Sequence, residues 1–279
     1  MRLALPLALL LAGCSAPVKP HAGGGAAPLR IVSTNPCADA MLVELVPPGR
    51  IAAISHYSQD PAATSMPLEV ANRFATTAGT AEEVIALDPD LVLTSSFTPA
   101  STRNAYDRAG LKTLLLDSPT TIEASKAQIV QVAAAVGEGA RGKVLNARID
   151  TALAAALPRS APGKGQEPSA LLFIVGGLAS GSGNLLDELL NRAGFRNAAT
   201  DYGLAFTGNL PIETIAAHPP SVILTPGPSR TSTLRARVLA ATRAGTTEAV
   251  FSRTLVNCGG PTIIPAITRL AAIRRQLAS

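Results

Sequence analysis

The side chains with the most chemistry in this sequence are two cysteines and two histidines. Cys37 and Cys258 lie near opposite ends of the chain, and three interpretations stay open: a disulfide, two thiols that face a ligand or a soft metal, or two unrelated buried residues. The His56 imidazole could bind a metal ion, although a polar loop position explains it equally well. His218 takes the place of a leucine in a repeated segment described below, which favours a packing role.

Sequence motifs for catalysis are missing. No G-x-S-x-G sequence surrounds Ser180 or Ser182, so the turn that exposes a hydrolase serine is not predicted. The glycines at 176–183 do not form the dinucleotide-binding pattern, since Leu186 stands where the last glycine belongs. We expect a protein that is not an enzyme, with no cofactor and no metal site of its own. The alternative is a cell-envelope enzyme of unknown hydrolytic activity on the same fold.

The composition indicates a folded protein that does not bind nucleic acid. Of the 279 residues, 47% are hydrophobic and only 15% are charged, which excludes a disordered chain. The net charge is +5, but the basic residues do not gather into one patch. Tryptophan is absent, so platforms on which bases could stack are scarce.

The sequence at the amino end predicts a secretion signal followed by a lipid anchor. Residues 1–13 combine a basic start with a short apolar run that ends in Leu-Ala-Gly before Cys14, which is typical of a bacterial lipoprotein signal peptide. We predict that Cys14 is lipidated and that the small, proline- and glycine-rich residues 14–28 form a flexible tether. The mature protein would then be periplasmic and held at the membrane only through its lipid.

The rest of the chain alternates short apolar strands with helices. Strands are predicted at 29–35, 51–55, 91–94 and 111–116, with helices at 36–46 and 99–109, and the pattern starts again near residue 170. This alternation predicts an α/β fold with parallel sheets covered by helices.

One segment of the sequence occurs twice, which predicts two related lobes. EEVIALDPDLVLT (82–94) aligns without gaps on ETIAAHPPSVILT (213–225), at a constant offset of 131 positions. Between the copies, residues 140–158 have apolar side chains at helical spacing and are predicted to form one long connecting helix. We therefore expect two Rossmann-like lobes, 29–139 and 159–279, with a ligand cleft between them.

In this order, the motifs resemble the substrate-binding proteins of iron-siderophore, haem and cobalamin ABC importers. The resemblance covers residues 29–279 and depends most on RIVSTNPCADAMLVEL (30–45), RIAAISHYSQDP (50–61) and the repeated segment. It implies a monomer that binds a metal chelate and delivers it to an ABC permease dimer with its ATPase. Cobalamin-binding members carry tryptophans around the cleft and this chain has none, which is an argument against cobalamin that does not exclude it. Ferric siderophore, corrinoid and haem therefore all stay open.

The ligand is expected beyond the carboxyl ends of the parallel strands, where ligands of such folds bind. By the resemblance, Tyr57 takes the place of a tyrosine that packs on a corrinoid. If Cys37 and Cys258 face each other across the cleft, a disulfide would lock the lobes together. The predicted ligand-binding residues are Asn35, Cys37, His56, Tyr57, Phe97, Ser180, Tyr202, Cys258 and Gly259.

Two acidic residues are predicted to dock on the permease. Glu82 and Glu213 occupy the same position in the two copies of the repeat, and the resemblance implies that one glutamate on each lobe pairs with permease arginines. One charge on each lobe suits a partner with two-fold symmetry. The alternative is that each glutamate only stabilises the amino end of its helix.

Overall fold

The computed structural model describes residues 29–157, 167–174, 177–227 and 245–277. The predicted signal peptide (1–13) and tether (14–28), with Cys14, lie outside these residues and stay predictions. Of the helices in the described ranges, none has the length and apolar character needed to cross a membrane.

The first half of the chain forms a five-stranded parallel sheet in the order β3-β2-β1-β4-β5. Its strands are β1 (Ile31–Ser33), β2 (Ile51–Ser55), β3 (Thr76–Thr77), β4 (Leu91–Ser95) and β5 (Thr113–Leu116). The register aligns Ile31 of the central strand β1 with Ile51 of β2 on one side and with Leu91 of β4 on the other. The strand β1 is buried along its whole length. Such continuous burial is expected where helices cover both faces of a parallel sheet.

The α-helices of this half begin next to one of two kinds of residue. One kind has a side chain that accepts a hydrogen bond from a free backbone amide, and the other is proline, which has no amide hydrogen. The helix α1 (Pro36–Leu45) has proline at its first position, and its cap Asn35 accepts a hydrogen bond from the Cys37 amide. The other helical segments are η1 (Pro48–Arg50), η2 (His56–Gln59), α2 (Leu68–Ala71), α3 (Ala81–Ala86), α4 (Ala100–Arg108) and α5 (Ile122–Ala135).

The second half repeats this plan with one parallel strand fewer. Its sheet has the order β11-β10-β6-β8, formed by β6 (Ser169–Leu172), β8 (Arg196–Asn197), β10 (Val222–Thr225) and β11 (Thr247–Val250). A small antiparallel pair, β7 (Leu178–Ala179) and β9 (Gly208–Asn209), lies beside it. Its helical segments are α7 (Leu185–Arg192), η3 (Ala198–Tyr202), α8 (Ile212–Ala217), η4 (Arg253–Leu255), η5 (Gly260–Thr262) and α10 (Ile263–Gln276).

The repeated segment folds in the same way in both halves. The helices α3 and α8 differ by the same 131 positions at both ends, and so do the first residues of β4 and β10. In each sheet this strand lies between the first strand of its half and the last, β1 and β5 or β6 and β11. The repeat therefore identified the fold correctly: two related parallel-sheet lobes.

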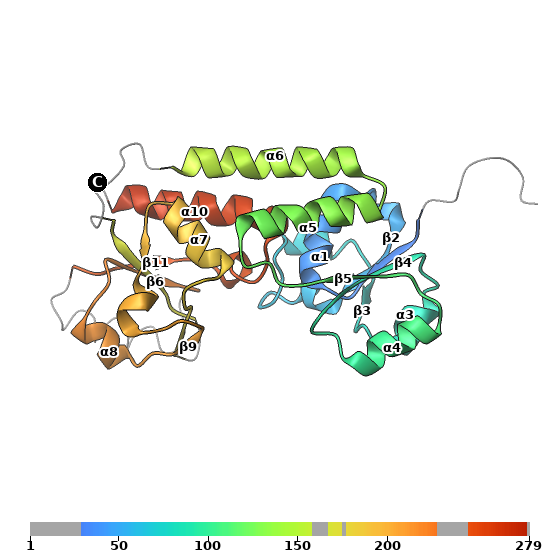
Figure 1. Cartoon of the computed structure of the whole chain (residues 1–279), viewed down its shortest axis with the longest axis horizontal. Helices are drawn as coiled ribbons and strands as arrows, with labels where there is room; N and C mark the ends of the chain where they lie inside the picture. Colours follow the sequence, from blue (N-terminus) through green and yellow to red (C-terminus); the bar gives the residue numbers. More distant parts are fainter. Residues whose placement is uncertain (1–28, 158–166, 175–176, 228–244, 278–279) are drawn as a thin grey trace, which may run out of the picture.

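A layer of three long helices joins the two lobes. The connecting helix α6 (Gly139–Ala156) runs along α5 of the first lobe and α10 of the second, on the side of the molecule away from α3 and α8 (Figure 1). Its buried face carries Leu145, Ile149 and Leu153, as the helical spacing predicts. These side chains belong to one hydrophobic core that continues through both lobes. A shared core of this kind limits how far the lobes can move apart.

The structure refines the start of the second half and corrects the role of His218. The pattern that starts again near residue 170 begins with β6, which starts at Ser169 and ends at Leu172, because the chain turns back there and the Ser180 amide donates a hydrogen bond to the Leu172 carbonyl. The His218 side chain is exposed and does not have the packing role predicted for it. Only its backbone carbonyl is used, as the acceptor for the Tyr202 hydroxyl at 2.5 Å.

Candidate ligand-binding cleft

A cleft of about 710 Å³ lies between the lobes. On the first lobe, all five parallel strands lead into it at their carboxyl ends, through residues such as Thr34, Tyr57, Ala78, Ser95 and Asp117. The second lobe contributes Ile174 after β6 and residues 256–259 after β11. The cleft therefore occupies the place where open parallel sheets bind ligands, and its volume suits a site that encloses most of a small molecule.

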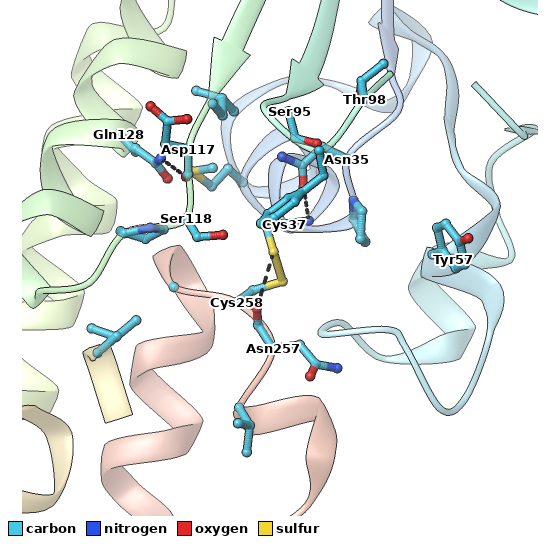
Figure 2. Close-up of a pocket in the computed structure, with 18 of the residues that line it drawn as sticks. Asn35, Cys37, Tyr57, Ser95, Thr98, Asp117, Ser118, Gln128, Asn257 and Cys258 are labelled. Atoms are coloured by element: carbon cyan, nitrogen blue, oxygen red, sulfur yellow. Dashed lines mark hydrogen bonds between the residues drawn. A yellow bond between two sulfur atoms is a disulfide. The ribbon is translucent and has the colours of Figure 1, made fainter. Parts of the chain in front are cut away.

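A disulfide between Cys37 and Cys258 crosses the cleft and joins the lobes covalently (Figure 2). The two Cα atoms are 5.2 Å apart. Cys37 lies in the first turn of α1, and Cys258 lies just before the C-terminal helical segment. The sequence analysis left three interpretations of these cysteines open, and the structure confirms the disulfide.

The chain next to Cys258 packs tightly against the first lobe. The Gly260 amide donates a hydrogen bond of 2.6 Å to the Ser125 hydroxyl of α5. A Cβ atom on Gly259 would overlap the same hydroxyl oxygen, so any larger residue there would force the segment or Ser125 to shift. Nearby, the Ile122 amide donates to a Glu188 carboxylate oxygen of α7 at 2.6 Å. The disulfide thus belongs to a wider contact between the lobes.

An asparagine from each lobe caps a helix and faces the cleft. Asn35 caps α1, and Asn184 caps α7 by accepting from the Asp187 amide at 3.1 Å. Both residues line the cleft. The Asn35 side chain uses its oxygen for the cap, so its amide hydrogens are not needed there and could donate to a ligand in the cleft.

Two aromatic side chains give the cleft exposed apolar surface. Tyr57 is 51% exposed and Phe97 is 80% exposed, and both line the cavity. The His56 ring packs on the Tyr57 ring, with 4.0 Å between the centroids, while His56 Nδ1 lies 3.2 Å from the Thr77 carbonyl oxygen. His56 is itself exposed and packs against Tyr57 without lining the cleft.

The cleft lining is rich in uncharged polar groups. Asp117, which follows β5, is the single charged residue among the described residues that line the cavity. Amides and hydroxyls dominate the rest of the polar lining, namely Thr34, Asn35, Ser95, Thr98, Ser118, Gln128, Ser180, Asn184, Thr207 and Asn257. Such groups both donate and accept hydrogen bonds, which suits a large ligand bearing polar but uncharged substituents.

Seven of the nine predicted ligand-binding residues line the cleft: Asn35, Cys37, Tyr57, Phe97, Ser180, Cys258 and Gly259. His56 does not line it, because its ring is turned to Tyr57 and Thr77. Tyr202 does not line it either, since it packs in the second hydrophobic cluster of the C-terminal lobe. Within the described ranges, no group of three histidine, cysteine or acidic side chains could hold a metal ion.

Several lining residues were missed by the sequence analysis although a signal was present. Asp117 and Ser118 follow directly after a predicted strand, and the rule that placed Phe97 in the cleft applies to them equally. Asn184 stands at the start of a predicted helix. Gln128 had no signal, since it lies within α5 and is oriented by donating a hydrogen bond to the Asp117 carbonyl.

The comparison with family models decides the class. The model described as "Periplasmic binding protein" matches residues 31–261, which include both lobes and the connecting helix. The chain belongs to the periplasmic binding protein family. This family contains solute-binding proteins of transport systems.

Solved structures of this family have the same fold. A haem-binding protein, BhuT, in complex with two haems has a TM-score of 0.71 at 23% identity, covering 90% of this chain and 99% of its own. The apo haem-binding protein RhuT of Roseiflexus sp. RS-1 has a TM-score of 0.69 at 22% identity, covering 91% and 100%. The vitamin B12-binding protein BtuF of Vibrio cholerae has a TM-score of 0.67 at 16% identity, covering 90% and 99%. A search of curated proteins found no match.

Proposed function

We propose that this periplasmic binding protein captures a metal-bearing tetrapyrrole in the inter-lobe cleft and delivers it to the permease of an ABC importer. The observation that carries the proposal is the cleft itself, a cavity of about 710 Å³ with exposed aromatic surface and many amide and hydroxyl groups. Structural neighbours whose titles name haem or vitamin B12 support the same ligand class. The chelate is cargo, so the protein needs no cofactor of its own.

The charge of the lining favours a corrinoid within this class. A ferric siderophore or a haem brings carboxylate or other anionic groups, which need nearby cations or amide donors. The described lining offers the Asp117 carboxylate and no lysine, arginine or histidine. The uncharged amide side chains of a corrinoid would instead find partners in residues such as Asn35, Ser118 and Asn257.

Haem is the second candidate because of Tyr57. A tyrosine oxygen can serve as an axial ligand of haem iron. The Tyr57 ring lines the cleft with half of its surface exposed, and His56 packs against it.

Binding of three probes to the purified protein tests the proposal: cyanocobalamin, ferric protoporphyrin and a ferric catecholate siderophore. Calorimetry suits all three, since the chain has no tryptophan whose fluorescence could be followed. We expect cyanocobalamin to bind most tightly and the anionic siderophore least. Tighter binding of ferric protoporphyrin, with a Soret band that changes in Tyr57→Phe, would select haem. If none of the three probes binds, the tetrapyrrole proposal is refuted.

We further propose that Glu82 and Glu213 dock on the permease. Both are exposed in the first turns of α3 and α8, which lie on the same side of the molecule, opposite α6 (Figure 1). The neighbouring Glu83 is already used, accepting from the Thr77 hydroxyl and the Ala78 amide at 2.7 Å each. Glu82 and Glu213 are therefore better placed to meet a partner.

The double variant Glu82→Ala/Glu213→Ala should reduce uptake of the cargo by cells while its affinity for the cargo stays unchanged. Glu69→Ala is the matched control, because Glu69 is also exposed in the first turn of a short helix but has no counterpart in the repeat. A loss of affinity in the double variant would place these residues at the ligand instead. The proposed lipid anchor is tested separately by Cys14→Ser, which should release the protein from the membrane fraction.

A further inference from the structure

Asp39 is a carboxylate buried in the first lobe directly behind the cleft. It lies in α1, two residues after Cys37, and its side chain is fully buried. Its Oδ2 accepts hydrogen bonds from the Ser55 amide at 2.9 Å and the Ser58 hydroxyl at 2.7 Å. Its Oδ1 has no hydrogen-bond partner among the described residues. Burying a carboxylate is costly, so its presence calls for a role.

The two groups that Asp39 binds flank Tyr57. Ser55 ends β2 and caps the short helix η2, in which its side chain accepts from the Tyr57 amide at 3.4 Å. Ser58 follows Tyr57 and is fully buried, whereas the Tyr57 ring itself is half exposed. Asp39 therefore fixes the backbone on both sides of a residue that would otherwise sit on a surface turn (Figure 2 shows Tyr57 on this turn).

We propose that Asp39 is a positioning residue for ligand recognition: it ties the turn at 55–58 to α1 and so holds the Tyr57 ring in the cleft. This inference rests on the proposed function, in which Tyr57 contacts the chelate. Because α1 also carries Cys37, one helix sets the position of both the disulfide and the aromatic wall. The ligand-contacting residue and the residue that orients it are then on different elements.

The first test measures the turn without any ligand. Hydrogen exchange followed by mass spectrometry should find the amides of residues 55–60 exchanging at least about tenfold faster in Asp39→Ala than in the wild-type protein. Asp39→Asn keeps an oxygen acceptor at the same place and should restore most of the protection. Asp90→Ala is the matched control, since Asp90 accepts from the Arg30 amide at 2.6 Å at the opposite end of the same sheet. Protection that is unchanged in Asp39→Ala, or lost equally across the lobe in Asp39→Asn, would overturn the proposal.

The second test is a double-mutant cycle on binding of cyanocobalamin or ferric protoporphyrin, whichever the wild-type protein binds. Asp39→Ala should weaken binding by about tenfold when Tyr57 is present and by less than about twofold in a Tyr57→Ala background. Equal losses in both backgrounds would overturn the inference, because Asp39 would then act on the fold and not through Tyr57. If neither probe binds, the proposed function fails, and the exchange result alone still supports or overturns the positioning of the turn.

Discussion

Removing the disulfide should lower the stability of the whole molecule, since it closes almost the entire folded chain into one loop. Cys37 and Cys258 are separated by 221 positions. In the chain-entropy model, cross-linking a loop of this length removes unfolded-state entropy equivalent to about 5 kcal/mol at 25 °C. Native disulfides of small secreted domains contribute about 2–5 kcal/mol. We therefore expect Cys37→Ser/Cys258→Ser to lose about 3–5 kcal/mol of the free energy of unfolding.

Urea unfolding followed by circular dichroism measures this loss. The hydrophobic core continues through both lobes, so a single cooperative transition is expected and a free energy can be extracted from it. The wild-type protein unfolded in dithiothreitol serves as the control, because reduction removes the same cross-link without changing the side chains. A loss below about 1 kcal/mol in both experiments would refute the entropy argument. Two separate transitions in the variant would instead indicate that the disulfide, and not the shared core, makes the lobes unfold together.

Three further predictions follow from individual residues. Tyr57→Ala should weaken chelate binding by about tenfold or more, whereas Tyr57→Phe should do so only if the hydroxyl binds the ligand, as calorimetry can measure. Gly259→Ala should destabilise the fold by about 1–3 kcal/mol in urea unfolding, because its Cβ would overlap the Ser125 hydroxyl; a neutral effect would mean that this segment can shift. Burial raises the pKa of Asp39 from 3.8 to about 7, against the opposing hydrogen bonds of the Ser58 hydroxyl and the Ser55 amide. The folded state then holds a proton that the unfolded state has released, so the free energy of unfolding should fall as pH rises from about 4 to 7. Asp39→Asn should lack this slope, and equal slopes in the two proteins would contradict the assignment.

The fold could be predicted because its signals are local and repeated. The buried strands β1, β2 and β4 are short apolar runs, and the copy of α3 and β4 in the second lobe is visible in the sequence itself. The strands β3, β7, β8, β9 and β11 were missed. Of these, β3 and β8 have two residues each and contain threonine, arginine or asparagine. They form because a neighbouring strand offers free hydrogen-bonding groups, which no local pattern reports.

The site could be predicted only in part, for a similar reason. Strand ends placed Asn35, Tyr57 and Phe97 in the cleft correctly, since this rule depends on topology alone. The rule cannot say which way a side chain turns, and His56 was therefore assigned to the ligand although its ring packs against Tyr57. Asp39 was overlooked because a carboxylate inside an amphipathic helix gives no sign in the sequence that it will be fully buried.

The disulfide also sets an order of events during biogenesis. If the chain is exported from its amino end, Cys37 reaches the oxidising compartment long before Cys258. Its thiol has no disulfide partner while the residues that form most of both sheets are still crossing the membrane. An early thiol of this kind can be captured by another protein or by a small thiol. Correct pairing then depends on residues 257–260 reaching α1 and α5, so the covalent link between the lobes forms only after most of the chain has been exported.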